Sequence, residues 1–262
     1  MRVSLLALFL AACATTGGGL HIEDAGRGGL PVVFVHGNGA SSAQWRAQFD
    51  HLRTSRRVVI YDLRGMGQSP VSELGDYSLG AMVSDLENVT RRRGLQRVVL
   101  VAHSYGGAVA ATYAARHPER VAGLVFVDST GSVNISEENA AKFEAAIRKN
   151  KDAVVAQWFA PILKPSSDDV KAAVLESVHK TNTDAFVGAL AGLRSFDMRA
   201  ALDRYPGPKL AIAAADIEGP SSFHVQFLDV PVRKISGAGH WLMLDRPDEL
   251  NRALDEFLAT LR

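Results

Sequence analysis

The chain has 262 residues, of which 47% are hydrophobic and 22% are charged, enough to bury the core of one domain that carries an insertion. Its formal net charge of +1 gives no reason to expect a nucleic-acid partner. After the first residues no apolar run has the length of a membrane-spanning helix, and no Cys/His spacing predicts a metal site.

The N-terminus carries the single cysteine of the chain, Cys13, so no internal disulfide is expected. Met1-Arg2 is a minimal positive start, residues 3–10 are apolar, and Leu10-Ala-Ala-Cys13 follows. This run resembles the lipobox of bacterial lipoproteins, where cleavage leaves a lipidated cysteine as the new N-terminus. We therefore interpret residues 1–19 as a lipoprotein signal and flexible tether, which predicts an exported protein attached to the bacterial cell envelope only through lipid.

One feature departs from that resemblance. The segment before Cys13 is shorter than the roughly 15 to 30 residues of a secretory signal. A start codon placed too far downstream would explain the difference. The alternative is an uncleaved apolar N-terminus on a cytoplasmic protein.

Short apolar strands alternate with amphipathic helices over residues 20–130. Such alternation predicts an α/β fold with a mostly parallel, doubly wound sheet. The expected strands cover residues 20–23, 31–35, 57–61, 98–101 and 121–127, and the expected helices cover residues 44–52, 79–93 and 105–116.

Between the strand at 98–101 and its helix lies the sequence Ala102-His-Ser104-Tyr-Gly106. A small-X-Ser-X-Gly pattern is typical of the nucleophile elbow of α/β-hydrolases, with Ala102 where glycine is usual. A one-residue reversal from strand to helix places the serine at a strained backbone angle, so bulky residues two positions away would clash. The alternative is a buried serine in an ordinary strand–helix unit.

The alternation stops after residue 130. Residues 131–202 show helical patterning without a core strand, and a block of that length is too long for a connection. We interpret it as a helical cap, whose Trp158 and Phe159, together with Trp241 near the C-terminus, are candidate substrate contacts; aromatic residues at helical spacing are more often core. The core resumes over residues 203–262 with strands at 208–215 and 232–235 and a final helix at 248–261.

Four stretches resemble the α/β-hydrolase superfamily, in its cap-bearing branch of esterases, lactonases and haloperoxidase-like enzymes. They are His36-Gly-Asn-Gly39, Asp62-Leu-Arg-Gly-Met-Gly-Gln-Ser69, Ala102-His-Ser-Tyr-Gly-Gly107 and Gly237-Ala-Gly-His-Trp241. The resemblance covers residues 20–262 and implies an α/β-hydrolase fold with an inserted helical cap. Fold alone does not assign the reaction.

Serine chemistry requires a base within hydrogen-bond reach of Ser104. His240 is the candidate, because its Gly-X-Gly-His loop lets an imidazole approach the elbow. The other histidines fit structural roles: His103 under the elbow and His36 in the oxyanion loop. The oxyanion hole is expected to consist of the backbone N–H groups of Asn38 and Tyr105.

The third triad member is less well determined. The resemblance implies an acid after the first strand beyond the cap, in a loop that usually reads Gly-X-X-Asp. Here the chain reads Ala213-Ala-Ala-Asp216-Ile-Glu218, without the glycine and with two candidate acids. Asp128, at the end of the strand before the cap, is a third candidate, although an aspartate there often caps a turn. Asp216 is ranked first, with Asp128 and Glu218 as alternates.

These residues together predict a serine hydrolase that is monomeric or weakly associated and cleaves a small, mostly apolar ester or lactone through an acyl-enzyme, without metal or cofactor. One alternative is a haloperoxidase-like perhydrolase with the same triad. Another is a slow-turnover protein that keeps the fold for ligand binding. A serine at the elbow argues against the dehalogenases and epoxide hydrolases, because those relatives use an aspartate nucleophile.

The Cys13 interpretation has a direct test. In a bacterium with lipoprotein-processing enzymes, the wild-type protein should be membrane-associated and labelled by radioactive palmitate, and Cys13→Ser should lose the label. Recovery of unlabelled wild-type protein from the soluble cytosol, with Met1 intact, would contradict it.

Overall fold

The computed structural model describes residues 19–261. The signal and tether predicted for residues 1–19, with Cys13, therefore lie outside the described residues except for residue 19. Within residues 19–261, no helix is both long and apolar enough to cross a membrane.

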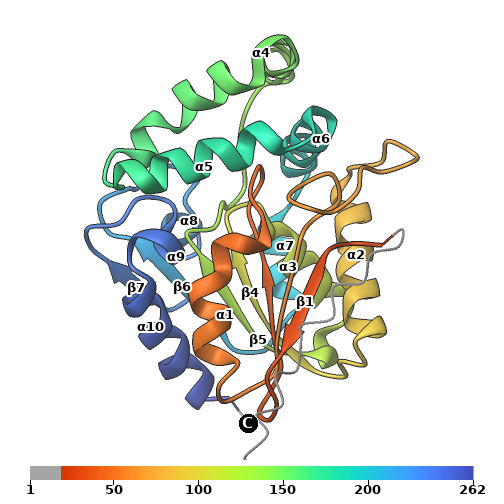
Figure 1. The fold of residues 1–262 in the computed structure, drawn as a ribbon, viewed down its shortest axis with the longest axis vertical. Helices are drawn as coiled ribbons and strands as arrows, with labels where there is room; N and C mark the ends of the chain where they lie inside the picture. Colours follow the sequence, from red (N-terminus) through yellow and green to blue (C-terminus); the bar gives the residue numbers. More distant parts are fainter. Residues whose placement is uncertain (1–18, 262) are drawn as a thin grey trace, which may run out of the picture.

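The centre of the molecule is a seven-stranded sheet in the order β1-β3-β2-β4-β5-β6-β7 (Figure 1). β1 is antiparallel to β3, and every other neighbouring pair is parallel. This confirms the predicted α/β-hydrolase fold class. The strands are β1 (Ile22–Ala25), β2 (Val32–Val35), β3 (Val58–Tyr61), β4 (Val98–His103), β5 (Val121–Val127), β6 (Lys209–Ala214) and β7 (Val232–Ile235).

Both faces of the sheet are covered, so its central strands read as unbroken apolar runs rather than as alternating ones. Alternate residues of β2 show this: Val33 and Val35 belong to the core cluster under the helices α2 (Leu79–Arg92) and α3 (Gly106–Arg116). Val32 and Phe34 belong to the cluster on the opposite face, with α1 (Arg46–Leu52) and α10 (Pro247–Ala259). The shorter helical turns of the core are η1 (Ser42–Trp45), η2 (Pro118–Arg120), α8 (Phe223–Gln226) and α9 (Leu242–Asp245).

Between β5 and β6 the chain forms α4 (Glu137–Leu163), α5 (Asp168–Lys180), α6 (Thr183–Arg194) and α7 (Met198–Asp203). Helices α4, α5 and α6 lie together at one end of the sheet, and we call these three the cap (Figure 1). α7 instead packs against α3 in the core through Met198, Ala201 and Leu202.

Polar residues start each cap helix. The side chains of Ser136, Ser167 and Asn182 accept hydrogen bonds from backbone N–H groups in the first turns of α4, α5 and α6. Such N-caps satisfy backbone donors that have no partner inside the helix. α4 ends at Leu163, and Pro165 follows two residues later, where it cannot donate a backbone hydrogen bond to continue the helix.

Candidate active site

The strand–helix reversal at Ser104 has the geometry that its small neighbours predict. β4 ends at His103, α3 begins at Gly106, and Ser104 has a φ of 51°, in the left-handed region that side chains rarely adopt. A Cβ on Gly106 would lie 2.5 Å from the carbonyl oxygen of Val35, so only glycine fits there. The reversal presents Ser104 at the carboxyl edge of the sheet.

His240 lies after β7 and is paired with an acid from the end of β5. Its Nδ1 donates to Oδ2 of Asp128 over 2.6 Å, while Oδ1 of Asp128 accepts from the backbone N–H of Ala214 at 3.1 Å. The side chains of His240 and Asp128 are only 15% and 9% exposed. With Nδ1 protonated, Nε2 of His240 carries the lone pair that a general base needs.

The structure corrects the order of the candidate acids. Asp216, ranked first from sequence, accepts the backbone N–H of Gly237 at 2.7 Å, and within residues 19–261 it forms no hydrogen bond with His240. Glu218 binds Lys234 and His224, and its hydrogen bond with Lys234 holds the pKa of Glu218 below its usual value. The loop after β6 directs Asp216 to the backbone of Gly237, whereas Asp128 follows directly from the end of β5, beside the elbow strand β4.

The loop after β2 lies directly against the elbow. A Cβ on Gly37 would be 2.9 Å from Nδ1 of His103 and 3.1 Å from Cβ of Ser104. In residues 19–261 no hydrogen bond uses the backbone N–H of Asn38 or of Tyr105, the two predicted oxyanion donors. Both N–H groups are therefore available to a developing oxyanion, as such a hole requires.

The side chain of Asn38 contacts the cap, which sequence reasoning missed. Its Nδ2 donates to the carbonyl oxygen of Phe186 in α6 at 2.9 Å. The next residue, Gly39, has a φ of 71°, and a Cβ there would meet the ring of Phe186 at 2.8 Å. Asn38 and Phe186 are 148 positions apart, and no local pattern in the sequence indicates that they meet.

Two buried histidines hold the loops around the site. His36 donates from Nδ1 to the carbonyl of Gly37 at 2.8 Å and accepts the N–H of Leu63 at Nε2 at 2.9 Å. His103 donates from Nε2 to the carbonyl of His240 at 2.9 Å. Burial lowers the pKa of His36, and it lowers that of His103 well below the usual value, with the neighbouring His240 adding to the effect. Both side chains are therefore neutral supports rather than proton carriers.

The turn over residues 62–69 is held by hydrogen bonds and by an ion pair. The Asp62 carboxylate accepts the backbone N–H groups of Ser42 and Gln68. Arg64 pairs with Asp85 in α2. Both residues stabilise the core around the site.

A cavity of about 800 Å³ lies between the cap and the carboxyl edge of the sheet. Its lining includes Asn38, Ser104, Tyr105, Asp128, Glu218 and His240, and the predicted contacts Trp158, Phe159 and Trp241, but not Asp216. A row of aromatic rings leads to His240. The ring centroids of Trp158 and Phe159 are 5.0 Å apart, those of Phe159 and Trp241 are 5.2 Å apart, and Trp241 lies edge-on to His240 at 4.9 Å. The wall beside His240 is thus mainly apolar.

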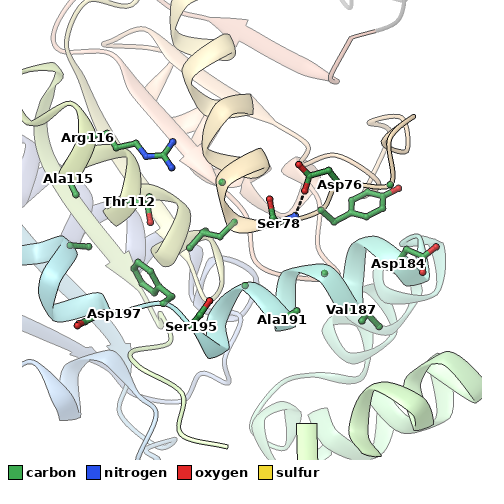
Figure 2. A pocket seen from close by; sticks show the side chains of 18 of the residues that line it. Asp76, Ser78, Thr112, Ala115, Arg116, Asp184, Val187, Ala191, Ser195 and Asp197 are labelled. Atoms are coloured by element: carbon green, nitrogen blue, oxygen red, sulfur yellow. Dashed lines mark hydrogen bonds between the residues drawn. The ribbon is translucent and has the colours of Figure 1, made fainter. Parts of the chain in front are cut away.

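A second cavity, of about 850 Å³, lies on the other face of α6 (Figure 2). Its lining includes Asp184, Val187 and Ala191 of α6, Ser195 just after that helix, and Asp76 and Ser78 in the segment that leads into α2. Val187 and Ala191 border both cavities, whereas Ser104 and His240 line only the first. The first cavity is therefore the candidate active site.

Comparison with known proteins agrees with this architecture. A profile described as alpha/beta hydrolase fold matches residues 31–163. The protein of Variovorax paradoxus (strain S110) named "Putative carbamate hydrolase RutD" is 30% identical over 260 residues, covering 92% of this chain and 96% of that protein. The chain belongs to the alpha/beta hydrolase fold family, and it is a hydrolase of that family.

Solved structures show the same fold. A thermophilic esterase from Thermogutta terrifontis has a TM-score of 0.81 and 26% identity, covering 92% of this chain and 93% of its own. A bromoperoxidase from Bacillus anthracis has a TM-score of 0.80 and 23% identity, covering 92% of this chain and 95% of its own. The second likeness concerns the fold alone.

The lowered pKa of His103 predicts a pH dependence of stability. An unfolded histidine binds a proton below pH about 6.5, whereas buried His103 resists protonation until the pH is lower. The unfolded state then binds more protons, so the free energy of unfolding falls as the pH drops from 6.5, by at most about 1.4 kcal/mol per pH unit for each such histidine. His103→Gln, which keeps a donor for the His240 carbonyl, should flatten this slope.

Urea unfolding of wild type and His103→Gln at pH 5.5, 6.5, 7.5 and 8.5 measures how the free energy of unfolding changes with pH in each protein. Equal slopes for wild type and His103→Gln between pH 5.5 and 6.5 would contradict the prediction. The interval above pH 7 serves as the internal control, because histidines contribute little there.

Proposed function

We propose that the protein is a serine hydrolase that cleaves a small, mostly apolar carboxylic ester or lactone through an acyl-enzyme. The observation that carries the proposal is the hydrogen bond of 2.6 Å between Asp128 and His240 in the cavity that Ser104 lines. It fixes the His240 tautomer that leaves Nε2 free to take a proton. Likeness to an esterase at 26% identity also supports an ester as the substrate class.

In the proposed reaction, Oγ of Ser104 attacks the acyl carbon while Nε2 of His240 takes the hydroxyl proton. The N–H groups of Asn38 and Tyr105 stabilise the oxyanion of the tetrahedral intermediate. His240 then returns the proton to the leaving alcohol, and the acyl-enzyme forms. A water molecule, deprotonated by His240, releases the acid by the same steps in reverse. Asp128 stays ionised and stabilises the imidazolium.

The proposed substrate class follows from the cavity lining. Phe159 and Trp241 are 6% and 3% exposed, and together with Trp158 they form an apolar wall beside His240. Such a wall favours an apolar acyl or alcohol group over a charged one, since burying a charge without a partner is costly. We further propose that lipid on Cys13 anchors the enzyme to the cell envelope.

The nucleophile is tested by Ser104→Ala. Removal of the hydroxyl should lower kcat for nitrophenyl esters by about 10⁴-fold or more and abolish labelling by a fluorophosphonate, with the fold intact. Ser84→Ala is a matched control, because this hydroxyl bonds only the Gly80 carbonyl within α2. A Ser104→Ala protein that is still labelled, or that keeps most of its activity, contradicts the serine mechanism.

The same purified proteins separate the alternatives. Bromination that requires peroxide and exceeds ester hydrolysis would favour the perhydrolase. Labelling by the fluorophosphonate without turnover of any ester would favour a ligand-binding protein.

The acid is tested by three single variants. Asp128→Asn should leave His240 in the wrong tautomer and without a countercharge, a change that lowers kcat by about 10⁴-fold in serine proteases. Asp216→Asn and Glu218→Gln should keep kcat/KM within about threefold of wild type, because neither carboxylate contacts His240. A large loss in Asp216→Asn, with Asp128→Asn near wild type, would reverse the assignment.

A further inference from the structure

The loop that carries His240 is attached to the end of a cap helix. The backbone N–H of His240 donates to the carbonyl oxygen of Ile162 at 3.1 Å. Ile162 lies in the last turn of α4, where carbonyls lack partners within the helix. The N–H four residues later, on Ser166, turns to the carbonyl of Leu163 instead. The open carbonyl of a cap helix therefore accepts the N–H of the proposed base.

The carboxylate of Asp245 binds both the His240 loop and a residue just beyond the end of α4. Oδ2 of Asp245, in the short helix α9, accepts the backbone N–H of Gly239 at 2.8 Å. The same oxygen accepts the hydroxyl of Ser166, just beyond α4, also at 2.8 Å. Ser166 is 5% exposed, so its hydroxyl is held in a buried place. Hydrogen bonds to a charged acceptor are stronger than neutral ones.

The backbone at Gly239, just before His240, has no room for even one additional methyl group. A Cβ on Gly239 would lie 2.5 Å from Oγ of Ser166, 2.7 Å from the carbonyl oxygen of Ile162 and 3.3 Å from Oδ2 of Asp245. The backbone before His240 is thus enclosed by the cap on one side and by Asp245 on the other. His240 has little freedom to shift without losing one of these contacts.

From this arrangement we infer that Asp245 is a positioning residue, which together with Ser166 holds the backbone of His240 against the cap. The inference rests on the proposed function, in which His240 is the base. The base must keep its bond with Asp128 and also reach Ser104, so a shift of about 1 Å in its loop can lower the rate about 10²-fold. The end of α4 then contributes to catalysis through a backbone carbonyl, in addition to the side chains with which it lines the cavity.

The test compares three variants with nitrophenyl acetate and a longer-chain ester. Asp245→Ala should lower kcat about 10- to 100-fold with KM within twofold, while Asp245→Asn, which keeps an acceptor oxygen, should stay within about threefold of wild type. Ser166→Ala should lower kcat about threefold. The fold loss in kcat should be the same for both esters, because a displaced His240 slows proton transfer whatever the length of the acyl chain. Nitrophenyl acetate has a single methyl beyond its acyl carbonyl, so it depends least on contacts with the pocket wall.

Asp203→Ala provides a matched control, because its carboxylate is 65% exposed and lines neither cavity. Circular dichroism and thermal melting establish which variants are folded, and the milder Ser166→Ala keeps the test informative if Asp245→Ala is not. The rate of fluorophosphonate labelling at Ser104 gives a second readout that needs no substrate turnover.

The outcomes separate the inference from the function on which it rests. A wild type that is neither labelled nor active would remove the proposed function. An active wild type with folded Asp245→Ala and Ser166→Ala variants of unchanged kcat would overturn the positioning role alone. A loss confined to KM or to the longer ester would also overturn it, because Asp245 and Ser166 would then shape the pocket. An Asp245→Asn variant as slow as Asp245→Ala would overturn it as well, because Asp245 would then act through its charge.

Discussion

The site depends on one strained reversal of the backbone. Ser104 holds a φ of 51°, a conformation that costs a residue other than glycine about 1–3 kcal/mol. The surrounding structure must stabilise this conformation, and it does so through contacts of the neighbouring backbone rather than through the side chain of Ser104. Gly106 lies against the carbonyls of Val35 and His36, and Gly37 lies against His103 and Ser104. The spacing of β2, β4 and α3 therefore determines where Ser104, the proposed nucleophile, and the loop of Asn38 lie.

Because the sheet is parallel from β3 to β7, its strands deliver Asn38, Ser104, Asp128 and the His240 loop to the same edge. Of the carboxylates that follow β5 and β6, Asp128 contacts His240 and Asp216 contacts Gly237. Asp128 follows the direct neighbour of β4, and its own φ of 39° shows a second backbone distortion at this edge. Asp216 stabilises the start of the His240 loop through Gly237, which is a supporting task.

The sequence allowed the fold class and the positions of Ser104, His240 and the oxyanion loop to be predicted, because each belongs to a local pattern of glycines and apolar runs. For the acid, the sequence ranked Asp216 before Asp128, whereas the structure pairs His240 with Asp128. That pairing joins residues 112 positions apart, and local sequence does not encode such a contact. The contacts of Asn38 with Phe186 and of Gly239 with Ile162 were missed on similar grounds, since each joins residues far apart in the chain. Trp158, Phe159 and Trp241 line the cavity, and their role as substrate contacts stays a prediction.

The cap is attached to the core at both loops that carry chemistry. Asn38 of the oxyanion loop donates to the carbonyl of Phe186 in α6, and His240 donates to the carbonyl of Ile162 at the end of α4. Both acceptors are backbone groups, so the side chains of the cap can vary without loss of these bonds. α4 thus supplies both Trp158 and Phe159 of the cavity wall and the carbonyl of Ile162 that binds the His240 loop, but through different atoms. Substrate preference can therefore change through residues such as Trp158 while the geometry at Ser104 and His240 is preserved.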